Sequence, residues 1–256
     1  SDVRIEVREQ LHISDLWVRP DIDRAEAELW VEVQSSEYGE FPVELDISLY
    51  GQNHSATVVE GMRYQPTAVR MCGLGDTFTA ALGPDSFGQG TPIPAEHGKN
   101  LYKVRIPMGE FLLWEPETPY LYQAQVALVR DGSVVDRAST PCGMRSFTED
   151  TEPDESGLRG MFKLNGRPIR LRGANTMGFE QQDVMRGDID QLRDDILLAK
   201  LCNMNFLRLT QRPVQDEVYK WCDRLGLMTQ TDLPLFAKMR RFKFAEGVRQ
   251  AQELAC

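Results

Sequence analysis

Residues 204–231 read MNFLRLTQRPVQDEVYKWCDRLGLMTQT, and their hydrophobic period changes twice. Residues 204–209 predict a strand. Apolar residues then recur at i, i+4, i+7, i+8 and i+11 from Val214 to Leu225, which is typical of a helix with one buried face. Gly226 stands where a helix usually ends, and residues 227–231 predict a second strand. The order strand, helix, strand indicates a parallel α/β sheet or barrel.

The stretch before it continues the same order towards the N-terminus. Residues 162–172 predict a hairpin, because Asn165 and Gly166 supply the positive φ angles of a type I′ turn. A helix is expected from about Asp188, which has capping-box spacing to Gln191, and residues 246–256 predict another helix. About three strand–helix units fill this region, whereas a closed eightfold barrel needs about 250 residues. The chain therefore holds either a small open sheet or the first part of a barrel.

The first half of the chain predicts strands without helices. Residues 28–34 and 43–50 alternate polar and apolar side chains, and shorter runs of the same kind follow. Asp131 and Gly132 lie between two such runs, where they predict a hairpin turn. Seven or eight short strands in about 145 residues favour an antiparallel, immunoglobulin-like β-sandwich. The Gly- and Pro-rich residues 73–99 predict a long loop, either a variable surface insertion or a ligand-contacting lobe.

Length, composition and charge support a two-domain division. The chain has 256 residues, of which 41% are apolar and 27% are charged, so it can bury a core. Residues 1–156 contain 12 basic and 27 acidic residues, and residues 157–256 contain 17 and 12, which gives net charges of −15 and +5. Five acids gather within residues 149–155 and indicate a linker. We expect a sandwich over 1–147, an acidic linker over 148–156 and a partial barrel over 157–256.

The sequence offers little to bind nucleic acid, a metal or a membrane. A net charge of −10 repels a phosphate backbone. The five cysteines form no C-x-x-C pair and have no neighbouring histidine, so we expect reduced thiols, no metal site and no cofactor. No run approaches about 18 apolar residues, and the N-terminus has neither a signal segment nor an initiator Met, which suggests a trimmed chain. We expect a soluble protein, either cytoplasmic or exported with its signal removed.

Four stretches of the sequence resemble, in the same order, those of a known enzyme family. They are residues 113–122 (LWEPETPYLY), 143–145 (GMR), 164–175 (LNGRPIRLRGAN), and 203–208 (NMNFLR) followed by 222–227 (CDRLGL). The family is glycoside hydrolase family 2, which includes β-galactosidases, β-glucuronidases and β-mannosidases. The resemblance implies a sandwich domain before the start of a TIM barrel. We expect Trp114 of the first stretch to pack at the end of the sandwich, with stacking on a sugar as the alternative. The resemblance also implies a fragment of a retaining, exo-acting β-glycosidase with a carbohydrate substrate.

The same resemblance places the catalytic carboxylates outside this sequence. Retaining hydrolysis needs two carboxyl groups about 5–5.5 Å apart, one to protonate the leaving group and one to attack the anomeric carbon. In the family, the first belongs to an Asn-Glu pair after the fourth barrel strand, and the second is a Glu after the seventh. The chain contains no Asn-Glu pair, and both positions would fall beyond Cys256. We therefore expect no catalytic residue in this chain and no hydrolysis by the chain alone.

Four residues near the ends of the expected barrel strands are candidates for substrate binding. Arg208 ends a strand, where barrel side chains face the pocket, and the matching family arginine supports an active-site carboxylate; a surface ion pair is the alternative. Asn175 ends the first strand and could bind a sugar hydroxyl or a loop. Asp232 resembles an acid of β-mannosidase-like members and could grip sugar hydroxyls or cap the next segment. Gln211 can donate and accept hydrogen bonds but cannot change charge near neutral pH.

Two departures from the β-galactosidase pattern leave the sugar open. Gln211 stands in place of a histidine, and Thr176 and Met177 stand in place of a His-Glu pair, which argues against galactoside specificity and its associated metal site. A mannoside or glucosaminide specificity fits at least as well. A carbohydrate-binding module or a purely structural domain pair is the alternative to an enzyme fragment. Because a truncated barrel leaves strand edges bare, we also expect a homo-oligomer or a poorly ordered C-terminal region.

Overall fold

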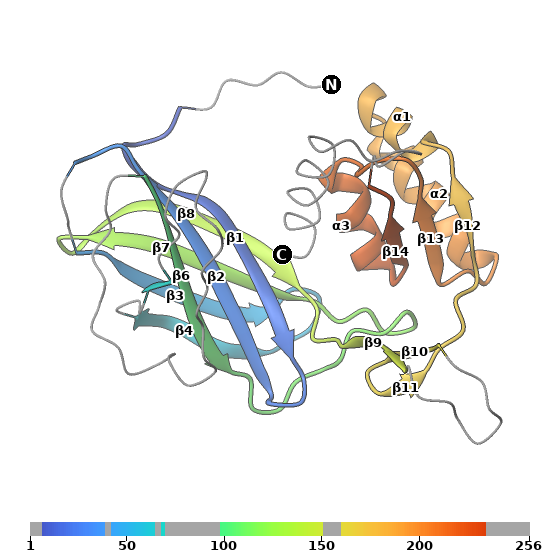
Figure 1. The fold of residues 1–256 in the computed structure, drawn as a ribbon, viewed down its shortest axis with the longest axis horizontal. Coiled ribbons are helices and arrows are strands. Elements are labelled where there is room, and N and C mark those ends of the chain that lie inside the picture. Colours follow the sequence, from blue (N-terminus) through green and yellow to red (C-terminus); the bar gives the residue numbers. More distant parts are fainter. Residues whose placement is uncertain (1–6, 39–41, 65–67, 70–97, 151–159, 234–256) are drawn as a thin grey trace. The chain divides into compact units, whose positions relative to one another are not determined.

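The computed structural model describes residues 7–38, 42–64, 68–69, 98–150 and 160–233. These residues form two compact units, which are considered separately (Figure 1). One unit takes the described residues up to Leu112 together with Tyr120–Met144, and the other takes Leu113–Pro119 and the described residues from Arg145 onwards. A seven-residue excursion from the first unit is thus part of the second.

The first unit is a sandwich of two four-stranded antiparallel sheets. Its strands are β1 (Leu11–Asp21), β2 (Glu26–Ser35), β3 (Glu44–Gly51), β4 (Thr57–Tyr64), β5 (Ala68–Val69), β6 (Gly98–Pro107), β7 (Tyr122–Arg130) and β8 (Ser133–Cys142). One sheet has the order β1-β2-β6-β5 and the other the order β4-β3-β7-β8. Asp131 and Gly132 join β7 to β8 with positive φ angles of 51° and 75°, which confirms the predicted hairpin.

Alternating side chains build one core between the two sheets. Leu45, Ile47 and Leu49 of β3 are fully buried, while the residues between them are partly exposed. They pack in one cluster with Leu29 and Val31 of β2, which belong to the other sheet. The predicted sandwich is therefore confirmed. Strand β4 was not predicted, because register shifts opposite β3 interrupt its pairing and its alternation.

The second unit contains a small antiparallel ribbon and a parallel sheet. The ribbon has the order β11-β10-β9, and the parallel sheet has the order β12-β13-β14. The strands are β9 (Phe147–Asp150), β10 (Met161–Leu164), β11 (Arg167–Pro168), β12 (Gly173–Thr176), β13 (Phe206–Leu209) and β14 (Met228–Thr231). The helices α1 (Phe179–Arg186) and α2 (Ile189–Leu201) connect β12 to β13, and α3 (Asp216–Leu225) connects β13 to β14. Helical crossovers between parallel strands are the repeating unit of an α/β barrel.

Local signals in the sequence fix the ends of these helices. The Asp188 carboxylate accepts a hydrogen bond from the Gln191 backbone N–H at 3.1 Å and caps α2, as predicted. Gly226 ends α3 with φ 74°, and a Cβ at this position would lie 2.2 Å from the carbonyl oxygen of Pro116. Glycine is therefore required here by both conformation and space. The core of the unit is formed by Leu192, Ile196, Leu207, Leu209, Val218, Cys222 and Leu227.

Several elements predicted from the sequence lie partly or wholly outside the residues that the structure describes. Nearly all of the loop expected over 73–99, and the helix expected over 246–256, lie outside the described residues; residues 98 and 99 belong to β6. Strand β9 includes residues 148–150, the first three positions of the expected linker. The domain bounds at 147 and 157 stay a prediction. Helix α1 was not predicted.

Candidate functional site

The carboxyl ends of β12, β13 and β14 bring the predicted site residues together. Asn175 lies in register with Arg208 on the neighbouring strand, and Arg208 lies in register with Gln230 on β14. Residues in register point to the same face of a sheet, and the alternate residues Leu207 and Leu209 are buried against the helices. Asn175 and Arg208 therefore share the face that a barrel turns towards its interior.

Arg208 and Asp232 form a two-pronged ion pair at this end of the sheet. Arg208 Nε donates to Asp232 Oδ1 at 3.0 Å, and Nη2 donates to Oδ2 at 2.8 Å. Asp232 directly follows β14, and its backbone N–H donates to the Leu209 carbonyl at 3.0 Å. The hydrogen bonds from Arg208 hold the pKa of Asp232 below its ordinary value, so the carboxylate is ionised at neutral pH. The pair uses two of the five N–H donors of the guanidinium group.

Gln211 reaches the same carboxylate through its backbone. Its N–H lies 3.4 Å from Asp232 Oδ2, its φ angle is 78°, and its side chain is exposed. A left-handed backbone is costly for glutamine, and such strain gathers at functional sites. The structure thus joins Arg208, Asp232 and Gln211 by hydrogen bonds. It places Asn175, whose side chain is also exposed, beside them by register.

Two residues that were not predicted as site residues border this cluster. Thr210 Oγ1 donates to the Thr176 carbonyl at 2.6 Å and lies 3.8 Å from Met177 Sδ. The Thr210 hydroxyl thereby ties the chain after β13 to the end of β12. Met177 is 66% exposed. Their positions directly after strands β13 and β12 were the signal that could have identified them, because barrel pockets are built from these connections.

Helix α1 buries its acidic side chains and exposes two of its three apolar ones, while Val184 packs against the core. Glu180 and Asp183 are 8% and 5% exposed, whereas Phe179 and Met185 are 65% and 60% exposed. Burial raises the pKa of both carboxyl groups, and the charge of Asp195 raises it further. One oxygen of each carboxyl group has no hydrogen-bond partner within the described part of the chain. Side chains this buried cannot contact a sugar, so we assign them a structural role.

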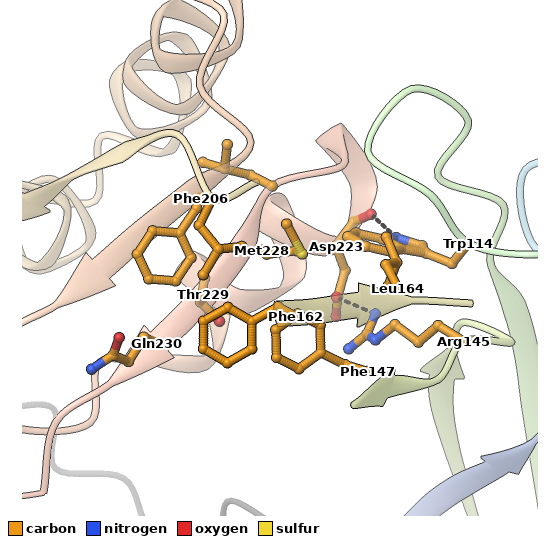
Figure 2. A pocket seen from close by; sticks show the side chains of 12 residues that line it. Trp114, Arg145, Phe147, Phe162, Leu164, Phe206, Asp223, Met228, Thr229 and Gln230 are labelled. Carbon is orange, nitrogen blue, oxygen red and sulfur yellow. Dashed lines mark hydrogen bonds and ion pairs between the residues drawn. The ribbon is translucent and has the colours of Figure 1, made fainter. Parts of the chain in front are cut away.

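The amino ends of the same strands carry an apolar cavity of about 430 Å³ (Figure 2). Phe206 and Met228, the first residues of β13 and β14, line it together with Phe147 and Phe162 of the ribbon. The rings of Phe147 and Phe162 stack with their centroids 5.3 Å apart. The amino end of a barrel serves stability, whereas the carboxyl end carries the chemistry. We therefore place the candidate binding site at the Arg208–Asp232 end.

Trp114 lines this cavity from the Leu113–Pro119 segment. The side chain is 1% exposed, and its Nε1 donates to the Asp223 carbonyl of α3 at 2.8 Å (Figure 2). The Arg145 guanidinium lies 4.7 Å from the indole centroid and pairs with the Asp223 carboxylate at 3.1 Å. Trp114 was expected to pack at the end of the sandwich; its segment belongs to the second unit, where its hydrogen-bond partner Asp223 lies in α3.

Cys142, Cys202 and Cys222 are free thiols, and burial raises the pKa of the Cys222 thiol, which makes it unreactive; Cys72 and Cys256 lie outside the described residues. Across the described ranges, no three or more His, Cys, Asp or Glu side chains gather as metal ligands. No helix in those ranges is long and apolar enough to cross a bilayer.

The fold and site define a class of proteins in which a β-sandwich precedes a parallel α/β barrel with its pocket at the carboxyl ends of the strands. Residues 11–145 match the family model described as glycosyl hydrolases family 2, and residues 158–248 match its TIM barrel domain. The chain therefore belongs to glycosyl hydrolase family 2, and the predicted family and fold are confirmed.

Several glycosidases resemble parts of this chain or share its fold. A β-galactosidase of Erwinia tasmaniensis is 34% identical over 141 residues, which are 54% of this chain and 13% of that protein. The solved β-D-mannosidase of Dictyoglomus thermophilum has a TM-score of 0.69 at 19% identity, over 96% of this chain and 28% of that one. A β-glucuronidase of Bacteroides uniformis has a TM-score of 0.62 at 19% identity, over 94% and 26%. At these identities the solved structures show a common fold, and this chain spans a minor part of each protein.

Proposed function

We propose that this chain is part of a retaining, exo-acting β-glycosidase that binds a β-linked sugar at the carboxyl ends of β12, β13 and β14. The observation that carries the proposal is the Arg208–Asp232 ion pair, which stands at the end of the sheet where barrel enzymes bind substrate. Family membership supports glycoside hydrolysis as the reaction class. Relatives named for galactose, glucuronic acid and mannose leave the sugar open.

The geometry suggests a division of roles within the site. Both oxygens of Asp232 accept hydrogen bonds from Arg208, so we assign Asp232 to positioning the guanidinium group. Arg208 then presents its other N–H donors to a sugar hydroxyl or to a catalytic carboxylate. The exposed amides of Asn175 and Gln211 can both donate and accept, as recognition of sugar hydroxyls requires.

The carboxyl pair for hydrolysis must come from elsewhere in the complete protein. A retaining enzyme needs two carboxyl groups about 5–5.5 Å apart, one of them protonated. Among the described residues, the carboxylate at this end is Asp232, and its lowered pKa makes it a poor proton donor. Glu180 and Asp183 are buried. We therefore expect this chain alone to bind a sugar without hydrolysing it.

The proposal is tested with a polypeptide that continues beyond Cys256 and with this chain alone. Both are assayed on 4-nitrophenyl β-galactoside, β-glucuronide and β-mannoside, and NMR follows the anomer formed first. We expect the longer polypeptide to hydrolyse at least one substrate with retention, and this chain to hydrolyse none. Turnover by this chain would overturn the assignment of the catalytic pair. A folded longer polypeptide that binds sugars without turnover would favour the carbohydrate-binding alternative.

A further inference from the structure

The sandwich carries a polar groove on the outer face of its β4-β3-β7-β8 sheet. The volume of the groove is about 650 Å³, within the range of about 300–1,000 Å³ that small-molecule sites occupy. Ser48 and Tyr50 of β3 line it, and Gln125 of β7 lies in register with Ser48 on the same face. The alternate residues Leu49 and Val126 are buried between the two sheets, so the groove faces away from the core. All its lining residues belong to the sandwich unit, whereas the strand-end site belongs to the other unit.

A β-bulge in β4 shapes this groove. Between two shifts of the register, Ser48 of β3 faces both Glu60 and Gly61 of β4. The Gly61 N–H donates to Ser48 Oγ at 3.0 Å, and Gly61 has a φ angle of 57°. Bulges redirect side chains and are over-represented next to functional sites. Here the bulge belongs to the wall that carries the Glu60 carboxylate.

The turn between β3 and β4 forms another wall of the groove and carries an energetic cost. The His54 ring lies edge-to-face against Tyr120 and Tyr122, with centroid distances of 5.4 and 4.8 Å. It also covers Gly51, where a Cβ would lie 2.7 Å from Nδ1 of the ring. Both ring nitrogens are buried, and neither has a hydrogen-bond partner within the described part of the chain. An unpaired buried polar group costs about 1–3 kcal/mol, and such departures from local rules are expected at functional sites.

The side chains of the groove have the chemistry that recognises neutral sugars. Its polar groups are the hydroxyls of serine, threonine and tyrosine, the amide of Gln125 and the carboxylate of Glu60. Hydroxyl and amide groups donate and accept, and a carboxylate accepts, which matches the hydroxyl groups of a sugar. Gln125 Nε2 donates to Tyr50 Oη at 2.6 Å and thereby holds the Tyr50 ring, whose apolar face can pack against sugar C–H groups. Because Glu60 repels an anion, a neutral sugar fits better than an acidic one.

We propose that this groove is a second carbohydrate-binding site, which holds a neutral oligosaccharide through Tyr50, Gln125 and Glu60. The inference goes beyond the proposed function and is independent of catalysis, because it rests on side chains of the sandwich unit alone. The role of such a site is to retain the protein on a saccharide without taking part in hydrolysis.

The experiment titrates this chain with cellobiose, mannobiose and lactose. NMR follows the amide resonances of β3, β4 and β7, while those of β12, β13 and β14 report on the strand-end site. We expect at least one disaccharide to shift the groove resonances, and Tyr50→Ala to raise its Kd about 5-fold. Tyr50→Phe keeps the ring and should raise the Kd less than 2-fold, so it tests the groove if Tyr50→Ala unfolds. Gln125→Ala should act like Tyr50→Ala, whereas the matched control Gln34→Ala, on β2 in the other sheet, should not change the Kd.

The outcomes separate this inference from the proposed function. Shifts confined to the ends of β12, β13 and β14 overturn the second site and leave the glycosidase assignment intact. An equal effect of Gln34→Ala, or no effect of either groove variant to alanine, also overturns it. Equal shifts with glycerol at the same concentration would show general polyol binding and would overturn saccharide recognition. Groove shifts that persist in Arg208→Ala uphold the inference, even if a longer polypeptide hydrolyses no glycoside and the proposed function fails.

Discussion

The two ends of the β12-β13-β14 sheet are built from the same short strands but have opposite chemistry. At the amino end, Phe206 and Met228 line an apolar cavity together with Trp114. At the carboxyl end, Arg208 and Asp232 form an ion pair beside exposed amides. Phe206 and Arg208 are two positions apart on β13, so only about 6.6 Å of backbone separates the packed end from the polar end. We still expect residues at one end to change with little effect at the other.

The largest expected effect is on stability at the amino end. Trp114→Ala should destabilise the second unit by about 3–5 kcal/mol, because it empties a fully buried site and removes the bond to the Asp223 carbonyl. Hydrogen exchange of the β13, β14 and α3 amides measures the loss, and the amides of β2 and β7 serve as internal controls. Trp114→Phe should cost less. Unchanged protection of β13 and β14 would show that the amino end does not anchor this sheet.

The next effect is on activity at the carboxyl end. Arg208→Ala should lower kcat/KM of the complete enzyme about 100-fold, since it removes charged hydrogen bonds and leaves Asp232 unpaired. Arg208→Lys should rescue little, because an ammonium group cannot reproduce the two-pronged contact. Asp232→Asn, which keeps the shape, should cost about 10-fold.

These carboxyl-end variants should leave the fold nearly unchanged. The ion pair is partly exposed, and such pairs contribute about 0–1 kcal/mol to stability. Hydrogen exchange of β13 and β14 is therefore expected to match that of the unsubstituted protein. A large loss of protection with Arg208→Ala would break the separation between the two ends, because the arginine would then be a structural residue.

The sequence predicted the strands and the strand-end residues of this sheet better than their contacts. Arg208 and Asp232 could each be placed at a strand end, because the hydrophobic period locates β13 and β14. Their pairing could not be predicted, since it depends on the register of β13 against β14. For Asp232, the resemblance left a sugar contact and a capping role equally open, whereas the ion pair favours a positioning role.

Two further features could not be predicted from the local sequence pattern. One has its polar and apolar faces reversed, and the other depends on a contact between distant residues. Helix α1 buries Glu180 and Asp183 and exposes Phe179 and Met185, so its hydrophobic period does not mark its buried face. Trp114 belongs to the second unit through a contact with residue 223, more than one hundred positions away. Long-range partners of this kind leave no trace in the local hydrophobic pattern.

Two hydrogen-bonded polar residues, Asn205 at the amino end and Thr210 at the carboxyl end, allow the stability of the two ends to be compared. Asn205, 3% exposed just before β13, accepts from the Arg172 backbone N–H at 2.8 Å and donates to the Arg170 carbonyl at 3.0 Å. Asn205→Ala leaves two backbone groups unpaired and should cost about 2 kcal/mol. Thr210→Val at the other end loses one hydrogen bond and should cost about 1 kcal/mol. Urea denaturation of both variants measures the difference, and equal costs would argue against a specialised amino end.

The smallest expected effect concerns a buried acid that follows the carboxyl end of β12. Burial raises the pKa of Glu180 in the folded state. Above the ordinary glutamate pKa of about 4.3, the folded protein therefore holds more protons than the unfolded chain, and stability falls as pH rises through the raised pKa. Glu180→Gln replaces the titratable carboxyl group with an amide that does not titrate in this range. The variant should therefore gain stability relative to the unsubstituted protein at pH 7, and the gain should vanish towards pH 4.

Denaturation midpoints between pH 4 and pH 8 measure this gain, and Glu217→Gln on the exposed first turn of α3 is the matched control. The control removes an exposed acid and measures the effect of the Glu→Gln substitution itself. Parallel stability curves for Glu180→Gln and the unsubstituted protein would contradict the prediction. If Glu180→Gln instead altered the pH dependence of kcat for the complete enzyme, location at the carboxyl end would outweigh burial, and the carboxyl end would hold a second functional acid.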